Sequence, residues 1–237
     1  MRLLLISNST NAGEGYLEHA SERIRDFLGG QVNKALFIPY AAVSFSFDEY
    51  QEKVQKRFDE FGVKVDPLHK YDHADKRKAV ENAEAIVVGG GNTFHLLKYL
   101  QQEKLIEVIR HKVLDGIPYI GWSAGSNVAC PTICTTNDMP ITEPENFHAL
   151  NLVRFQINPH YLDAHPQGHA GETREMRIKE FLIVNPYIYT VGLREGSMFL
   201  IENGQIHLLG DKKARIFKGE EQPSELAPGD DFDFLFE

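Results

Sequence analysis

Short apolar runs alternate with amphipathic stretches through the first half of this chain. The runs that predict buried strands cover residues 3–7, 35–39, 63–68, 85–88 and 119–122. Helical periodicity appears at residues 15–28 and 47–61, and further helices are expected from about residue 94 and directly after residue 123. Strands separated by helices form βαβ units, with parallel strands and helices on both faces of the sheet. The pattern therefore predicts an α/β fold with a predominantly parallel sheet.

The pattern changes after residue 185, where short apolar runs follow one another closely at 187–193, 197–202, 205–209 and 214–218. Turn sequences such as Glu202-Asn203-Gly204 separate these runs and are typical of β-hairpins. We therefore expect C-terminal antiparallel hairpin strands at one edge of the sheet. A chain of 237 residues, 42% of them apolar, can bury one substantial core, so we expect a single domain over residues 1–237.

Composition restricts the compartment and the partners. No apolar stretch approaches the roughly 18 residues of a membrane-spanning helix, and the N-terminal apolar run is too short for a signal peptide. A cytoplasmic protein without a membrane partner is expected. The net charge of −9, from 34 acidic and 25 basic residues, argues against a nucleic-acid partner. Cys130 and Cys134 have no second Cys or His pair nearby, so we expect ordinary thiols and no metal site.

The strongest candidate for chemistry is Gly121-Trp122-Ser123-Ala124-Gly125, a G-x-S-x-G sequence directly after a predicted strand. In a nucleophile elbow of this form, the serine is exposed on a sharp turn between a strand and a helix, and side chains at the two glycine positions would clash. We therefore predict that Ser123 is a catalytic nucleophile. The alternative is a structural turn that happens to contain a serine.

A serine nucleophile needs a base, and histidine is the usual one. His160 follows an apolar run at residues 152–157, so it is expected at a strand end, where functional side chains gather in open parallel sheets. The third group should be a carboxylate that orients the imidazole. The spacing leaves two candidates open, Asp138 in a polar loop and Glu195 at the end of a late strand.

Three consecutive glycines at residues 89–91 follow another predicted strand. Because glycine has no Cβ, the backbone there can approach a ligand closely. We expect the amides of Gly91 and Ala124 to form an oxyanion hole beside the nucleophile. A phosphate-binding loop is the competing interpretation, but the segment lacks the G-x-G-x-x-G spacing and the lysine of a Walker loop.

Five segments together resemble the peptidase E family of α-aspartyl dipeptidases. Agreement of five segments in the same order is far more specific than any one motif. The resemblance extends from about residue 4 to beyond residue 196. The segments are 88–94 (VGGGNTF), 120–125 (IGWSAG), 135–140 (TTNDMP), 157–160 (INPH) and 171–174 (GETR).

This resemblance implies a fold like that of class I glutamine amidotransferases, with serine in place of the nucleophilic cysteine. It implies hydrolysis of dipeptides with an N-terminal aspartate (Asp-X) through an acyl-enzyme on Ser123, with His160 as the base and no metal or other cofactor. Asp138 and Glu195 both fall on positions proposed in the family for the third member, and Glu195 is slightly favoured. Arg174 falls on the position associated with binding the substrate aspartate, for which a planar guanidinium is suited. The implied partner is a small peptide substrate, and a homodimer is left open.

Two other classes of protein compete with the peptidase. An α/β-hydrolase esterase would have its Ser, Asp and His in the chain order of Ser123, Asp138 and His160. Its histidine would normally lie near the end of the sheet, whereas hairpins follow the histidine here. A non-catalytic binding module on the same fold would retain the sheet without a reactive serine. A true glutamine amidotransferase is disfavoured because neither cysteine lies at the elbow.

Overall fold

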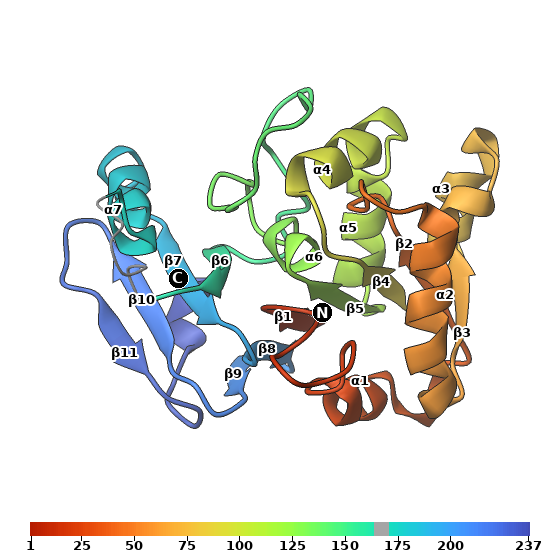
Figure 1. The fold of residues 1–237 in the computed structure, drawn as a ribbon, viewed down its shortest axis with the longest axis horizontal. Coiled ribbons are helices and arrows are strands. Elements are labelled where there is room, and N and C mark those ends of the chain that lie inside the picture. Colours follow the sequence, from red (N-terminus) through yellow and green to blue (C-terminus); the bar gives the residue numbers. More distant parts are fainter. Residues whose placement is uncertain (164–170) are drawn as a thin grey trace.

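The strands of this chain form two sheets (Figure 1). The computed structural model describes residues 1–163 and 171–237. The first sheet contains β1 (Arg2–Ile6), β2 (Lys34–Ile38), β3 (Lys64–Pro67), β4 (Ile86–Val88), β5 (Pro118–Trp122), β8 (Met198–Glu202) and β9 (Gln205–Leu209). The second contains β6 (Gln156–Tyr161), β7 (Tyr189–Arg194), β10 (Ala214–Lys218) and β11 (Ser224–Leu226).

The first sheet has seven strands in the order β3-β2-β4-β5-β1-β8-β9. Strands β3, β2, β4, β5 and β1 are parallel to one another. Strand β8 then pairs antiparallel with β1, and β9 returns beside it as a hairpin. The predicted parallel sheet with C-terminal hairpin strands is therefore confirmed.

Helices cover both faces of this sheet because alternate residues of each strand point in opposite directions. Leu4 and Ile6 of β1 pack beneath α1 (Ser21–Leu28) and α2 (Phe47–Phe58). Leu3 and Leu5 face α3 (His73–Glu81), α4 (Thr93–Gln102) and α5 (Ile106–Leu114). A strand buried on both faces has apolar residues in succession, which is why these strands appear as continuous apolar runs in the sequence.

The second sheet is the feature that periodicity did not predict. Its order is β11-β10-β7-β6, so β7 and β10 do not extend the first sheet. Helix α7 (Arg174–Val184) covers one face of it and contributes Ile178 and Leu182 to a small core with Tyr161 and Phe217. In Figure 1 this sheet and α7 form a lobe beside the larger sheet. Short strands joined by turns have the same pattern in either sheet, so the sequence alone does not assign them.

Three local details also differ from expectation or add to it. The helix expected over 15–28 begins only at Ser21, after a series of turns in which Leu17 adopts a φ of 54° that no helix accommodates. Helix α6 (Ala124–Asn127) is a single turn. The acidic C-terminal segment docks through a 3₁₀ turn (Asp233–Phe236) that buries Leu235.

The helices of the described ranges include none long and apolar enough to cross a membrane.

Candidate active site

Ser123 forms the turn between β5 and α6, as the elbow motif predicts. Its backbone angles are φ 53° and ψ −112°, outside the regions that a side chain tolerates easily. The carbonyl oxygen of Ile6 in β1 accepts two hydrogen bonds that hold this turn, one from the amide of Ser123 at 3.0 Å and one from the hydroxyl of Ser126 at 2.7 Å. The neighbouring strand therefore keeps the serine in a conformation that it would not adopt alone.

The glycines on either side of Ser123 are required by close contacts. A Cβ added to Gly121 would lie 2.3 Å from the carbonyl oxygen of Gly125, and one added to Gly125 would lie 2.2 Å from that of Val88. The triple-glycine loop also packs on the nucleophile, since a Cβ on Gly90 would lie 2.9 Å from the Cβ of Ser123. Each glycine thus removes a side chain where two segments of backbone touch.

His160 lies close to the end of β6, and its Nε2 atom is 2.9 Å from the hydroxyl oxygen of Ser123. Its φ is 53°, and the register of β6 against β7 shifts between Asn158 and Tyr161. A bulge of this kind changes the direction in which a side chain points. We attribute the orientation of the imidazole toward the elbow to this irregularity, because side chains in a regular strand point alternately to the two faces of the sheet.

Glu195 follows the end of β7, and its Oε1 atom is 2.7 Å from Nδ1 of His160. An ionised carboxylate can only accept, so Nδ1–H donates to Glu195, and Nε2 is left to accept the hydroxyl proton of Ser123. Together these contacts give the geometry of a Ser-His-carboxylate triad. The side chains of His160 and Glu195 are 36% and 43% exposed, so the pair is accessible from solvent.

Two residues that no motif singled out hold the strands of this triad together. The buried hydroxyl of Ser7 accepts a hydrogen bond from the amide of His160 at 2.9 Å and donates one to the carbonyl of Leu193 at 2.8 Å. The side-chain oxygen of Asn8 accepts from the amide of Gly196 at 2.8 Å. Both residues directly follow β1, at the same carboxyl edge of the sheet as Ser123. This position was the available signal, because functional groups gather at that edge.

A polar loop braces β6 from its other side. The side-chain amide of Asn158 donates to the carbonyl of Thr135 at 2.8 Å, and that of Asn137 donates to the carbonyl of Pro159 at 2.6 Å. The residue directly before His160 is therefore tied to the loop that carries Asp138. The segments TTNDMP and INPH, separated in sequence, lie together in the structure.

Asp138 does not take the position of the third triad member. Its Oδ2 atom instead accepts hydrogen bonds from the amide and the hydroxyl of Thr93, at 2.7 and 2.6 Å. Thr93 is the first residue of α4, directly after the glycine-rich loop. Of the two carboxylates left open by the sequence, the structure brings Glu195 to His160 and Asp138 to the first residue of α4. The α/β-hydrolase interpretation thereby loses the carboxylate that its chain order requires.

The two amides expected to form the oxyanion hole lie beside the nucleophile. Ala124 directly follows Ser123, and Gly91 follows the glycine that packs against it. Tyr50 holds the loop in place, since its hydroxyl accepts from the indole of Trp122 at 3.0 Å and donates to the carbonyl of Gly90 at 2.9 Å. Within the described ranges, no residue accepts a hydrogen bond from the amide of Gly91 or Ala124, so both are available to a ligand.

Arg174 begins α7 and lines a cavity of about 60 Å³ together with Asn137 and Asn158. Burial lowers the pKa of its guanidinium, and the nearby charge of Arg177 lowers it further, whereas the negative charge of Asp138 raises it. In the part of the chain that the structure describes, no residue accepts a hydrogen bond from this guanidinium. Arg174 is thus a half-buried cation with donors to spare, within electrostatic reach of Asp138.

The cysteines do not compete for the role of nucleophile. Cys130 is buried, and burial raises the pKa of its thiol to about 12, which keeps it protonated at neutral pH. Cys134 is exposed, and both are free, as expected. Residues 1–163 and 171–237 contain no group of three or more His, Cys, Asp or Glu side chains that could hold a metal ion.

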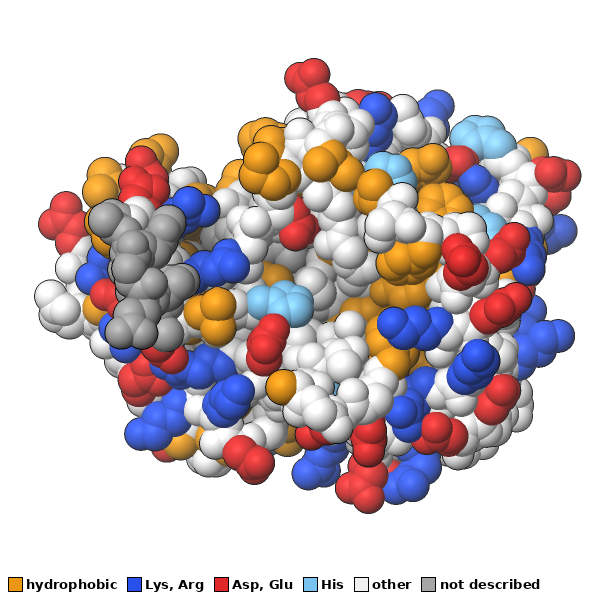
Figure 2. Space-filling model, viewed as in Figure 1, with side chains coloured by type: hydrophobic (Ala, Val, Ile, Leu, Met, Phe, Trp, Pro, Cys, Tyr) orange, Lys and Arg blue, Asp and Glu red, His pale blue; other side chains and the backbone are white. Residues whose placement is uncertain are grey.

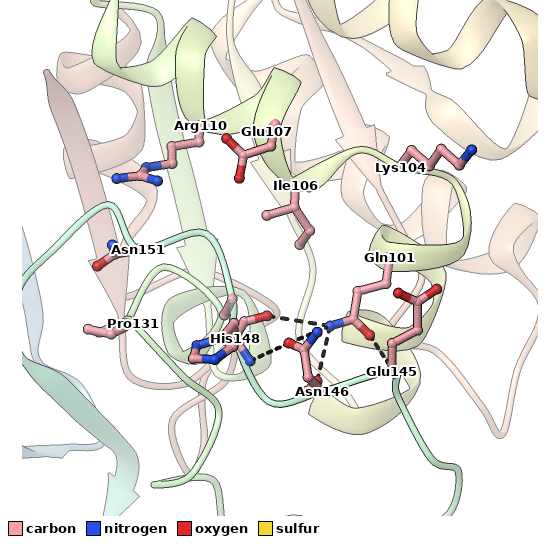
Figure 3. A pocket seen from close by; sticks show the side chains of 11 residues that line it. Gln101, Lys104, Ile106, Glu107, Arg110, Pro131, Glu145, Asn146, His148 and Asn151 are labelled. Carbon is pink, nitrogen blue, oxygen red and sulfur yellow. Dashed lines mark hydrogen bonds between the residues drawn. The ribbon is translucent and has the colours of Figure 1, made fainter. Parts of the chain in front are cut away.

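A second pocket, of about 500 Å³, lies between α4, α5 and the loop at 145–151 (Figure 3). The side-chain amide of Gln101 bridges this pocket by donating to the carbonyl of Asn146 at 3.0 Å, while its oxygen accepts from the amide of Glu145 at 2.8 Å. None of its 11 described lining residues is a serine or a cysteine. The contacts of Gln101 hold the surface loop at 145–151 against α4. The residues with candidate catalytic chemistry lie at the elbow and not in this pocket.

Figure 2 shows that this face of the molecule is hollowed between the lobe of the second sheet and the lobe of α4 and α6. The partial exposure of the His160 and Glu195 side chains places both at the molecular surface. Basic side chains lie on the side of the second sheet. The triad is therefore placed where a small ligand can reach it.

Nearly the whole chain is similar in sequence to known peptidases. Residues 3–209 match the sequence model of Peptidase family S51. The chain is 55% identical over 236 residues to a protein named peptidase E from Nostoc sp., covering 100% of this chain and 97% of that protein. It is 47% identical over 232 residues to peptidase E from Salmonella typhimurium, covering 98% and 100%. The crystal structure of a peptidase from an acI-B1 Actinobacterium superposes with a TM-score of 0.72 at 18% identity, over 98% of this chain and 96% of that one. At this identity the similarity supports the fold alone.

Proposed function

This chain belongs to Peptidase family S51 and is a serine-type peptidase, and we propose that it is a dipeptidase that hydrolyses Asp-X dipeptides. The observation that carries the proposal is the series of contacts from the hydroxyl of Ser123 through both ring nitrogens of His160 to Glu195, at 2.9 and 2.7 Å. The peptidase E names of the relatives support the reaction class. The aspartate preference rests on Arg174 and on the family resemblance.

In the proposed acylation step, the oxygen of Ser123 attacks the carbonyl carbon of the Asp–X bond while Nε2 of His160 takes the hydroxyl proton. Glu195 accepts a hydrogen bond from Nδ1–H of the ring and stabilises the imidazolium that forms. The negative charge that develops on the carbonyl oxygen accepts hydrogen bonds from the amides of Gly91 and Ala124. Because these amides belong to a braced loop and a fixed turn, they need little reorganisation as the charge develops.

Collapse of the tetrahedral intermediate breaks the C–N bond. The leaving amine of residue X takes the proton from Nε2 of His160 and departs, which leaves the aspartyl group esterified to Ser123. A water molecule then attacks the ester carbonyl while the neutral imidazole accepts one of its protons. The second tetrahedral intermediate expels the serine oxygen, which takes that proton back, and aspartate is released.

Recognition of the aspartate side chain is assigned to Arg174. A planar guanidinium can donate two parallel hydrogen bonds to one carboxylate, even on a protein whose net charge is −9. The cavity of about 60 Å³ beside it has room for a carboxylate or a few waters. Burial lowers the pKa of this guanidinium, and the negative charge of a carboxylate placed beside it would stabilise the charged form.

The test is a panel of Asp-Leu, Glu-Leu, Asn-Leu and Ala-Leu measured with the wild type, Arg174→Ala and Arg77→Ala. We expect Asp-Leu to be the best substrate of the wild type. Arg174→Ala should lower kcat/KM for Asp-Leu about a hundredfold and bring it close to the value for Asn-Leu. Arg77, which is exposed on α3 and pairs with Glu81 away from this cavity, is the matched control and should keep the preference. An equal loss for all four dipeptides in Arg174→Ala would contradict the assignment.

A further inference from the structure

Asp138 carries a carboxylate in the site that the triad does not use. Its Oδ2 atom is taken by the amide and hydroxyl of Thr93, at 2.7 and 2.6 Å. Within residues 1–163 and 171–237, no group donates a hydrogen bond to its Oδ1 atom. One oxygen thus anchors the side chain, and the other is available to a ligand.

Two sets of contacts connect the loop that carries Asp138 to the triple-glycine loop and to the strand that carries His160. Thr93, its hydrogen-bond partner, is only two residues beyond Gly91. Its preceding neighbour, Asn137, donates at 2.6 Å to the carbonyl of Pro159, the residue directly before His160. The loop that carries this carboxylate is therefore fastened both to the start of α4, next to the triple-glycine loop, and to the strand that carries His160.

Arg174 supplies the opposite charge within electrostatic reach of Asp138. The N-terminal residue of an Asp-X dipeptide also carries two opposite charges, on adjacent carbons, namely the α-ammonium and the side-chain carboxylate. A ligand with this arrangement would be matched by a carboxylate and a guanidinium on the protein. Glu195 is not free for this role, because it accepts a hydrogen bond from Nδ1–H of His160.

We propose that the carboxylate of Asp138 binds the α-ammonium group of the substrate's N-terminal residue, and that the enzyme therefore requires a free amino terminus. This inference rests on the proposed function, since it needs a substrate cleaved directly after its first residue. A charge-assisted hydrogen bond of this kind contributes more than a neutral one. It would select against amino-blocked peptides and against Asp–X bonds inside longer chains.

A purely structural role for Asp138 predicts something different. In that case the side chain only fastens the loop at 135–140 to the first turn of α4. Asp138→Asn separates the two roles, because asparagine keeps one oxygen that accepts from Thr93 and replaces the other, charged carboxylate oxygen with an uncharged NH2 group. Asp233 is a matched control, since its carboxylate also accepts from a backbone amide, that of Ile206 at 2.9 Å, away from the elbow.

The experiment measures binding by titration calorimetry in the Ser123→Ala background, with Asp-Leu and with succinyl-leucine, which is Asp-Leu without its amino group. We expect Ser123→Ala to bind Asp-Leu at least about tenfold more tightly than succinyl-leucine. In Ser123→Ala/Asp138→Asn the ratio should fall to about one, and in Ser123→Ala/Asp233→Asn it should be retained. A ratio that survives Asp138→Asn would overturn the inference.

A measurement on the unaltered enzyme covers the case in which Asp138→Asn does not fold. L-Aspartate should inhibit turnover of Asp-Leu at least about tenfold more strongly than succinate, which lacks the amino group. Equal inhibition would overturn the inference while leaving the proposed function intact. Failure of the proposed function is distinguishable, because Asp-Leu would then be neither bound by Ser123→Ala nor hydrolysed by the wild type.

Discussion

The hydroxyl of Ser7 lies 2.9 Å from the backbone amide of His160, a residue 153 positions later in the chain. The same hydroxyl donates to the carbonyl of Leu193 in β7, the strand that leads to Glu195. A single buried side chain at the end of β1 therefore connects the sheet that carries the nucleophile with the sheet that carries its base. The positive φ of His160 is maintained at this connection.

Ser7→Ala should lower both activity and stability. The change leaves the amide of His160 and the carbonyl of Leu193 without their partner in a buried position, which costs about 1–3 kcal/mol. We expect kcat for Asp-Leu to fall about tenfold to a hundredfold with little change in KM, because the imidazole and not the substrate site is displaced.

Thr190→Val is the control for this loss. The hydroxyl of Thr190 in β7 is buried, and no partner for it exists among the described residues. Replacing it with a methyl group should raise the free energy of unfolding by up to about 1 kcal/mol and leave kcat unchanged. Urea unfolding and steady-state kinetics measure both. Equal kcat for Ser7→Ala and the wild type would show that the hydrogen bond does not position the base.

Glu195→Gln should impair the chemical step with every substrate. Glutamine cannot stabilise the imidazolium, and its amide can donate to Nδ1 and hold the ring in the wrong tautomer. We expect kcat and the rate of Ser123 labelling by a fluorophosphonate to fall at least about a hundredfold. Glu202→Gln, which changes a carboxylate of β8 paired with Arg2, serves as the control. Labelling at the wild-type rate in Glu195→Gln would exclude Glu195 from the triad.

The contacts of the elbow glycines predict that alanine substitution destabilises the protein there far more than at an uncrowded glycine. Gly125→Ala would place a Cβ 2.2 Å from the carbonyl oxygen of Val88, a backbone atom that cannot move aside as a flexible side chain could. The free energy of unfolding should fall by about 3 kcal/mol or more. Gly30→Ala, at a site with no atom within 4 Å, should change it by no more than about 0.5 kcal/mol. Similar values for the two variants in chemical denaturation would refute the packing argument.

An ion-pair network beside the triad predicts how stability depends on pH. Glu225 accepts hydrogen bonds from Arg194 at 2.8 Å and Arg215 at 2.9 Å, and these bonds, led by that of Arg194, lower its pKa below the ordinary 4.5. A carboxyl group whose pKa is lower in the folded state stabilises the protein above its unfolded pKa. That contribution is lost as the pH falls through the folded value.

Glu225→Gln should therefore be less stable than the wild type at neutral pH, and the two unfolding free energies should converge as the pH falls below 4.5. Urea denaturation in steps from neutral pH to about pH 3 measures this convergence. Parallel curves over the whole range would show that the network does not contribute through ionised Glu225.

Much of the fold followed from apolar periodicity, because strands buried on both faces and amphipathic helices leave distinct patterns. The partition of the late strands did not, since β8 continues the first sheet while β7 and β10 join β6, and all three have the pattern of hairpin strands. The helix expected from residue 15 was shortened by local turns that periodicity does not detect.

The sequence predicted the part of the site that depends on local backbone geometry. It left open the part that depends on contacts between distant segments. The elbow identified Ser123 because its glycines are demanded by backbone contacts within one turn. The choice between Asp138 and Glu195 depends on which loop reaches His160, a distance set by the packing of two sheets. Ser7 carried no motif at all, and only its position at the end of β1 indicated a role.

The most direct measurement of the central claim is the turnover of Asp-Leu by Ser123→Ala, combined with mass spectrometry after fluorophosphonate treatment. The account predicts a single adduct on Ser123 of the wild type, no adduct on the variant, and no turnover above background by a variant that unfolds at the same urea concentration as the wild type. Hydrolysis of Asp-Leu by Ser123→Ala at the wild-type rate would contradict it.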